Sequence, residues 1–289
     1  MNKAIKIPLR ILLYLFLLIM LVFALFPVVY ILLSSFKTNS EILVGGTNII
    51  PTTWRLENYV EAWNLANFGT LTMNSVFYTF FVVIGCIITG TVAGYVFSRG
   101  KSVFTRIMYR MVLFSMFISI GTLALYPQLR VARVIGVSGT LWGPILIRVL
   151  GMNATQVFIA TGNVDQIPRE LDEAARIDGC GFFSTFVRII FPLLKPLVAT
   201  IGLLAFRIAW SDYLLPYVFT ISKRATWTLV VGLVNLKSGG ESASSWNLMF
   251  AGIGISILPM TLVYLILNKF FIAGLRALFR PLPDRKSVM

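Results

Sequence analysis

The chain has 289 residues, of which 57% are hydrophobic and 12% charged, and its mean hydropathy is +0.85. One soluble domain could not bury so much apolar surface, so the composition excludes an ordinary globular protein and predicts a lipid bilayer around the chain. The net charge of +14 is then expected to reflect the placement of lysine and arginine relative to the membrane, with no nucleic-acid partner. The absence of histidine removes the commonest general base and the commonest metal ligand.

Six apolar runs are long enough to cross a membrane as helices, for which about 20 residues are needed. They cover approximately residues 11–33, 71–97, 107–127, 141–160, 197–219 and 250–271. The first run is longer than a signal-peptide core and no cleavage site follows it, so we expect a retained anchor. In the second, Gly90 and Gly94 form a small-xxx-small motif that allows close helix packing. The fourth run is the weakest, because it contains Arg148. The expected fold is all-α, a polytopic membrane protein with six transmembrane helices.

The distribution of basic residues predicts the orientation of these helices. If the N-terminus is cytoplasmic, the segments on its side of the membrane hold most of the lysines and arginines, as the positive-inside rule requires. We therefore expect a cytoplasmic N-terminus at residues 1–10, a six-helix domain at residues 11–275 and a cytoplasmic tail at residues 276–289. The outer segments, residues 34–70 and 220–249, carry aromatic side chains that are expected to lie at the membrane interface, with contact to a partner as the alternative.

A charged island, residues 163–192, separates the fourth and fifth apolar runs. Asp165 is expected to cap the start of a helix by accepting hydrogen bonds from free backbone N–H groups. Pro168 is tolerated in the first turn, and the helix should continue over residues 169–177.

A second short helix is expected after a turn. Gly179 and Gly181 permit a sharp turn with positive φ, and residues 182–190 can then form a helix that Pro192 and Pro196 end. Such a helix-turn-helix bracket would lie on the membrane face as a rigid lever between the fourth and fifth spans.

The first helix of the bracket has two different faces by helical spacing. One holds Glu170, Glu173 and Ile177, and the other holds Leu171, Ala174 and Ala175. Carboxylates offer charge-assisted contacts and small residues allow close approach of a backbone, so the helix suits docking of a second protein. The simpler alternative is an amphipathic loop that only solvates the edge of the bundle.

The island reads Glu173-Ala174-Ala175, three residues, Gly179, nine residues, Ile189, one residue and Phe191-Pro192. At this spacing it resembles the EAA loop of ABC-importer permeases, which usually has Leu where this chain has Phe191.

Other segments resemble the carbohydrate-uptake permeases of that family. Residues 206–216 are similar to the fifth-span signature, with Trp210-Ser211-Asp212 where Trp-Asn-Asp or Trp-Asn-Glu is usual. Residues 51–59 and 270–275 are similar as well, so the resemblance extends over nearly the whole chain.

The resemblance implies a MetI-like permease fold of the maltose-importer type in the bacterial inner membrane, with a carbohydrate as solute. It also implies three partners: a second permease subunit, a dimer of ATP-binding subunits that hold ATP and Mg, and an extracytoplasmic solute-binding protein. This chain would then be no enzyme and hold no cofactor. Its segment Gly94 to Ser102 lacks the glycine spacing of a phosphate-binding loop. The residues expected to couple to the ATPase are Glu170, Glu173, Ala174, Ala175, Asp178 and Gly179.

Arg148 and Arg207 lie well inside the fourth and fifth apolar runs, where a charge costs a few kcal/mol and is a functional candidate by default. The only acid near a span, Asp212, follows Arg207 at a spacing that pairs poorly on a helix, so at least one arginine is expected to face a wet cavity or a partner. A guanidinium group suits carboxylates, which suggests an acidic solute such as a uronic-acid oligosaccharide. Snorkelling or a salt bridge to the second permease is the alternative. The expected substrate-pathway residues are Arg148, Arg207, Trp210, Asp212 and Tyr213.

An ion-coupled secondary transporter of a small solute is the main alternative function. It predicts buried acids or an inverted repeat, and the sequence shows neither. A membrane-embedded enzyme would need a catalytic cluster at one interface. No such cluster and no metal-ligand motif are visible, so neither catalytic nor metal-binding residues are expected.

Overall fold

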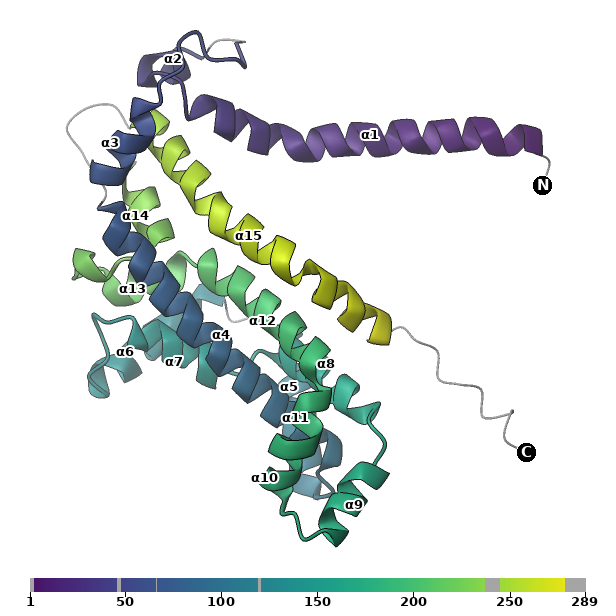
Figure 1. Ribbon diagram of the computed structural model, residues 1–289. Coiled ribbons are helices and arrows are strands. Elements are labelled where there is room, and N and C mark those ends of the chain that lie inside the picture. The colour runs from purple at the N-terminus through teal and green to yellow at the C-terminus, as the bar shows by residue number, and fades with distance from the viewer. Residues whose placement is uncertain (1–2, 46–47, 66, 119–120, 237–244, 279–289) are drawn as a thin grey trace. The chain divides into compact units, whose positions relative to one another are not determined.

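The computed structural model describes residues 3–45, 48–65, 67–118, 121–236 and 245–278 (Figure 1). In these ranges the chain forms helices joined by turns and loops, without a strand, as the all-α prediction requires. By its internal contacts the chain divides into two compact units. Unit 1 combines Met1–Gly69 with Gly232–Leu258, and unit 2 combines Thr70–Val231 with Pro259–Met289.

Unit 1 joins the first helix to parts of the two predicted outer segments. Its helices are α1 (Lys3–Ser34), α2 (Asn39–Leu43), α3 (Glu57–Leu65) and the first turns of α15 (Trp246–Leu278). The buried Asn58 side chain of α3 donates hydrogen bonds to the backbone carbonyls of Ser35 and Lys37 and accepts one from the side-chain amide of Asn247. These buried bonds hold the two segments together.

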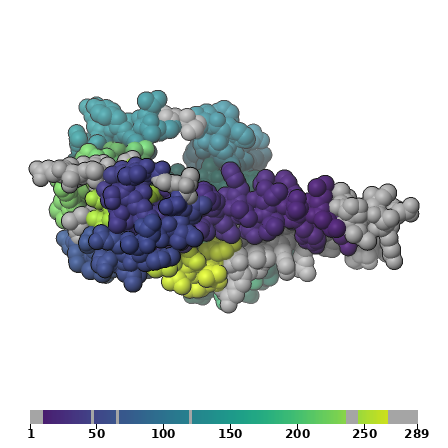
Figure 2. Space-filling view, turned by 90° about the horizontal axis from the view of Figure 1, so that it is seen from above, coloured from purple at the N-terminus to yellow at the C-terminus, as the bar shows by residue number. Residues whose placement is uncertain are grey.

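Most of α1, the first predicted span, lies free of the rest of unit 1. Side chains from Arg10 to Val29 are exposed, and the chain becomes buried only near Ser34. Figure 2 shows the helix (purple) projecting beyond α2 and α3 (dark blue). An apolar helix exposed over residues 10–29 requires lipid or another protein around it.

Unit 2 is built along α4 (Phe68–Arg99), a continuous helix without proline (Figure 1). Through Tyr78 and Val82, α4 shares a buried cluster with α7 and α12, and through Tyr95 it shares a second with α8, η2 and α12. The other elements of this unit are α5 (Val103–Phe114), η1 (Gly121–Ala124), α6 (Leu125–Val134), α7 (Trp142–Leu150), α8 (Ala154–Asp165), α9 (Glu170–Ile177), α10 (Phe182–Thr185), η2 (Phe186–Ile190), α11 (Phe191–Leu193), α12 (Lys195–Trp210), α13 (Leu214–Thr220), η3 (Arg224–Thr226), the start of α14 (Leu229–Leu236) and the part of α15 that begins at Pro259.

The close packing of α4 on α8 depends on one glycine of the predicted small-xxx-small pair. A Cβ atom at Gly94 would lie 2.5 Å from the Cβ of Ala160 and 2.9 Å from its carbonyl carbon. At Gly90 the nearest atom to such a Cβ would be a side-chain carbon of Ile201 at 3.4 Å, an ordinary contact. Only Gly94 is therefore required for the approach of the two backbones.

Within the described residues, α1, α4 and α15 are each long and apolar enough to span a membrane, and up to five spans result if two bent helix pairs each count as one. The predicted fourth span is one such pair, in which α7 and α8 meet at 44°. The predicted fifth span starts as α12, at 82° to the helical segment before it. α12 ends at Trp210, and α13 begins after a break at residues 211–213.

The predicted third span, residues 107–127, is not a continuous helix. α5 ends at Phe114, and the next helical turn begins at Gly121, beyond residues 119–120, which lie outside the described ranges. Gly121 has a φ of +57°, a left-handed conformation that an α-helix excludes. Apolar composition indicates where a chain meets lipid, but it does not determine whether the helix there is unbroken.

Candidate functional site

Residues 170–193 form the helix-turn-helix bracket that the sequence predicts. α9 is its first arm, and α10, η2 and α11 continue from one another as its second arm (Figure 1). Leu194 separates the second arm from α12. The predicted second helix is thus confirmed, and it ends between Pro192 and Pro196 as expected.

The turn of the bracket is a Schellman motif centred on Gly179. The N–H of Cys180 donates to the carbonyl of Ala175 (2.8 Å), and the N–H of Gly179 donates to the carbonyl of Arg176 (3.1 Å). Gly179 has a φ of +80°, which only glycine adopts without strain. Gly181 has a φ of −74°, so the prediction of positive φ is confirmed for Gly179 and wrong for Gly181.

The predicted cap at Asp165 is wrong. α8 continues to Asp165, and α9 begins only after Arg169, without a side-chain cap. The residue before a proline disfavours the helical conformation, so the break falls at Ile167 and Pro168. Asp165 instead accepts a hydrogen bond from the hydroxyl of Ser98, at the end of α4.

The two alanines of the bracket differ in burial. Ala175 is 1% exposed and packs inside unit 2, whereas Ala174 is exposed. The prediction of one face containing both is therefore wrong, because neighbouring residues on an α-helix point about 100° apart. The side chains of Glu170, Glu173, Ile177 and Asp178 are exposed together with Ala174, and Ile177 reaches 87% exposure.

An ion pair ties the first arm of the bracket to the end of α4. Arg99 Nε donates to Asp172 Oδ2 (2.9 Å), and the Arg99 NH2 group donates to the backbone carbonyl of Ile167 (2.7 Å). The Tyr95 hydroxyl donates to Asp172 Oδ1 (2.7 Å). The side chains of Arg99 and Asp172 are only 7% and 15% exposed. We call the set Tyr95, Arg99 and Asp172 the latch.

Tyr95 connects the latch to the second arm as well. Its ring lies 4.6 Å from that of Phe182 and 5.3 Å from that of Phe186. The latch charges also suit the helix ends that carry them, since Arg99 lies in the last turn of α4 and Asp172 in the first turn of α9. The latch was not predicted from the sequence. The sequence held two signals for it: Arg99 ends an apolar run, and Asp172 is not on the helix face that holds Glu170 and Glu173.

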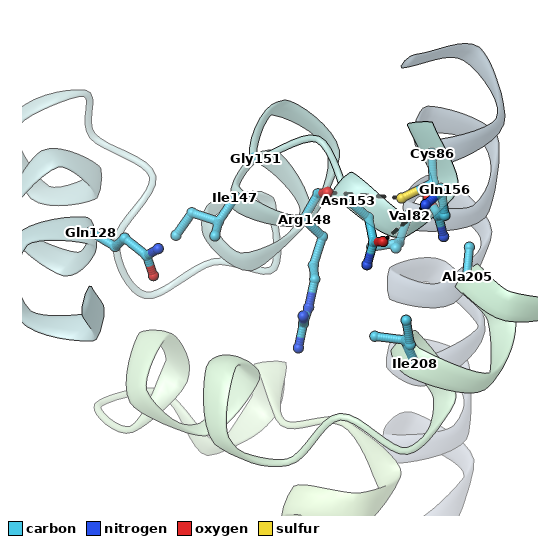
Figure 3. Close-up of a pocket in the computed structure, with 10 residues that line it drawn as sticks. All are labelled: Val82, Cys86, Gln128, Ile147, Arg148, Gly151, Asn153, Gln156, Ala205 and Ile208. Atoms are coloured by element: carbon cyan, nitrogen blue, oxygen red, sulfur yellow. Dashed lines mark hydrogen bonds between the residues drawn. The ribbon is translucent and has the colours of Figure 1, made fainter. Parts of the chain in front are cut away.

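A polar cavity of about 230 Å³ lies farther along α4 (Figure 3). Helices α4, α6, α7, α8 and α12 contribute to its wall. Its lining residues are Val82, Cys86, Gln128, Ile147, Arg148, Gly151, Asn153, Gln156, Ala205 and Ile208. One guanidinium group and three amide side chains thus meet among apolar residues.

Arg148, beside this cavity, pairs with Asp212. Its Nε and NH2 groups both donate to Asp212 Oδ2, at 2.9 and 2.6 Å, and the Tyr78 hydroxyl donates to the same oxygen at 2.9 Å. The side chain of Asp212 is 6% exposed and that of Arg148 is 36% exposed. The sequence had offered Asp212 only Arg207 as a partner. The break after α12 turns Asp212 inward, toward a helix distant in sequence.

The other predicted pathway residues do not line this cavity. Arg207 is exposed on α12, and among the described residues its side chain forms no ion pair. Trp210 is buried and stacks on Phe206, with ring centroids 5.7 Å apart. Tyr213 stacks on Tyr217 at 5.3 Å. The structure therefore brings together Arg148 and Asp212 out of the five predicted residues.

Comparisons with known proteins agree with this architecture. A family model described as "Binding-protein-dependent transport system inner membrane component" matches residues 86–277. The melibiose/raffinose/stachyose import permease protein MelC of Bacillus subtilis is 33% identical over 78% of this chain and 81% of its own. The diacetylchitobiose uptake system permease protein NgcG of Streptomyces coelicolor is 28% identical over 84% of this chain and 80% of its own.

A solved structure shares the fold. It is the crystal structure of a bacterial ABC transporter involved in the import of the acidic polysaccharide alginate. One of its chains matches 94% of this chain over 99% of its own length, with a TM-score of 0.79 and 24% identity.

Proposed function

Because the chain belongs to the family of binding-protein-dependent transport system inner membrane components, we propose that it is the permease subunit of an ATP-driven importer that carries a carbohydrate into the cytoplasm. Relatives named as permeases for melibiose, raffinose and stachyose, for diacetylchitobiose and for galactooligosaccharides support a carbohydrate as solute. Two partner subunits bind ATP and Mg and hydrolyse the nucleotide, while this chain spans the bacterial inner membrane.

The observation that carries this proposal is that one face of α9 is exposed while its other face is packed against the rest of unit 2. Glu170, Glu173, Ala174 and Ile177 point outward, while Ala175 and the latch hold the opposite face. Ile177 adds an apolar side chain, 87% exposed, to this face, which a docked protein would cover.

In this proposal the bracket and both termini lie in the cytoplasm, which the distribution of basic residues supports. Closure of the ATP-binding dimer pushes the bracket and switches the transport cavity from inward-facing to outward-facing. The extracytoplasmic solute-binding protein then delivers the solute, and a second permease subunit completes the cavity. Asp178 and Gly179 contact the ATPase together with α9, since they continue the exposed face of that helix at the turn.

The docking role is tested with two neighbouring substitutions in the complete transporter. Ala174→Phe enlarges an exposed residue, so we expect normal insertion and thermal stability of the permease but loss of ATPase co-purification and uptake. Ala175→Phe is the matched control, because it overfills a buried site and lowers stability by itself. Full ATPase binding and uptake with Ala174→Phe would show that this face does not dock the ATPase.

The polar cavity is proposed to contact the solute. The charge of Arg148 is balanced by Asp212, so the cavity offers hydrogen bonds rather than net charge. Amides of Gln128, Asn153 and Gln156 carry both donors and acceptors, which suit sugar hydroxyls. Its volume is below the roughly 300 Å³ of a typical ligand pocket, so it holds at most one sugar unit of a longer solute.

Selectivity for an acidic solute is assigned to Arg207 in this proposal. Arg207 lies in the last turn of α12 but well inside the apolar run at residues 197–219, where an exposed charge is costly against lipid, so its side chain must face a wet path or a partner. Its guanidinium forms no ion pair with an acid among the described residues, whereas that of Arg148 pairs with Asp212. We expect Arg207→Leu to reduce uptake of uronate-containing oligosaccharides more than uptake of neutral ones. An equal reduction for both sugars would instead indicate a salt bridge to the second permease.

A further inference from the structure

α4 contacts both parts of the candidate site. Near its cytoplasmic end, Tyr95 and Arg99 hold Asp172 of the bracket. Earlier in the same helix, the Tyr78 hydroxyl binds Asp212, which in turn binds Arg148 at the polar cavity. Tyr78 and Tyr95 are separated by about 25 Å along the axis, at a rise of 1.5 Å per residue. One helix therefore connects two clusters that are distant in space.

The covalent connections of the bracket are less direct than this contact. α9 is joined to α8 through the irregular residues 166–169, and the second arm meets α12 at 82°. In contrast, α4 is unbroken, packs closely on α8 at Gly94 and reaches the bracket through buried side chains. Displacement of a lever passes more faithfully through a rigid, packed contact than through a loop or a sharp bend.

We propose that the latch transmits movement of the bracket to α4, and through α4 to the cluster of Tyr78, Asp212 and Arg148. The inference rests on the proposed docking of an ATPase on the outer face of α9. In it, Arg99, Asp172 and Tyr95 are positioning residues that make coupling possible without touching ATP or solute. The second and fifth spans then move with the bracket, because Asp212 follows α12 and Tyr78 lies on α4.

The contacts of the latch favour transmission in both directions of movement. The Arg99 side chain binds both Asp172 and the carbonyl of Ile167, so it holds the entry to α9 at two points. The Tyr95 ring lies against Phe182 and Phe186 while its hydroxyl holds Asp172, so both arms contact the same side chain. Movement of either arm, toward α4 or away from it, is therefore transmitted to α4.

The test uses the complete transporter in liposomes with its solute-binding protein. Arg99→Met removes the charge and keeps most of the aliphatic side chain. Because the docking face is unchanged, ATPase subunits should still co-purify and hydrolyse ATP, while solute moved per ATP falls by about tenfold or more, within the range of coupling between protein sites. Arg99→Lys should restore part of the coupling, and the charge-exchanged double variant Arg99→Asp, Asp172→Arg should couple better than either single variant.

A milder variant keeps the inference testable if Arg99→Met does not assemble. Tyr95→Phe removes only the hydroxyl bond to Asp172 and leaves the ring between Phe182 and Phe186. A reduced ratio of solute to ATP with unchanged stability supports the latch. Unchanged ratios in Tyr95→Phe and in any assembled Arg99 variant would overturn it. The docking proposal is judged separately by Ala174→Phe, since that variant should lose the ATPase itself.

Discussion

Removing Arg148 should destabilise the protein more than removing the charge of its partner, Asp212. The two side chains differ in access to water, with 36% of Arg148 and 6% of Asp212 exposed. Among the described residues, Arg148→Met leaves the buried carboxylate of Asp212 with the hydroxyl of Tyr78 as its one remaining donor. Asp212→Asn leaves an arginine whose guanidinium can still reach the polar cavity. The unpaired group is thus much costlier in the first variant.

The magnitudes follow from these exposures. Breaking a buried ion pair from one side costs about 3–5 kcal/mol, and the near-complete burial of Asp212 places Arg148→Met in this range. For Asp212→Asn we expect about 1–2 kcal/mol, the cost of weakened hydrogen bonds to a partly solvated cation. Thermal unfolding of the purified transporter in detergent should rank the variants in that order.

A double-mutant cycle tests the same reasoning independently. The double variant Arg148→Met, Asp212→Leu carries no unpaired charge, so it should be more stable than Arg148→Met alone. If the destabilisation of the double variant equals the sum for Arg148→Met and Asp212→Leu measured singly, the two side chains do not interact. Equal destabilisation by Arg148→Met and Asp212→Asn would refute the assignment of different burial to the two charges.

Further substitutions have matched controls in the chain. Gly94→Ala should weaken the packing of α4 on α8 by about 1–3 kcal/mol, because its Cβ would overlap Ala160, whereas Gly90→Ala should be nearly neutral; equal thermal midpoints would contradict this. Gly179→Ala should cost about 1–2 kcal/mol from its positive φ, although no atom lies within 4 Å of the new Cβ. Gly181→Ala, also in open space but with negative φ, should retain wild-type stability and uptake.

The sequence predicts those helices that depend only on the hydropathy of consecutive residues. The apolar runs at α1, α4 and α15 are long, and the helices continue through Pro27 in α1 and Pro259 in α15, so hydropathy is sufficient to locate them. The run at residues 107–127 is also long and apolar, but its first helix ends at Phe114, and Gly121 has a positive φ. Hydropathy measures solvation and contains no term for backbone conformation, so it could not separate the two cases.

The candidate site shows the same division between local and distant causes. The bracket was predictable because a glycine turn and flanking prolines act within a few residues. The partners of Asp172 and Asp212 were not, because Arg99 and Arg148 come from helices far away in sequence. Charge pairing over such separations depends on how the helices pack, and spacing along one helix carries no information about it.

Three small residues of the bracket appear equivalent in sequence but are small for different physical reasons. Ala175 is small because unit 2 closes around it, and Gly179 is a glycine because the Schellman turn requires positive φ. Ala174 meets neither constraint, since it is exposed on a regular helix. Larger residues at Ala175 and Gly179 should therefore perturb the permease even when it is purified alone. A larger residue at Ala174 should have a measurable effect only when the ATPase subunits are present, because only a partner approaching from outside limits its size.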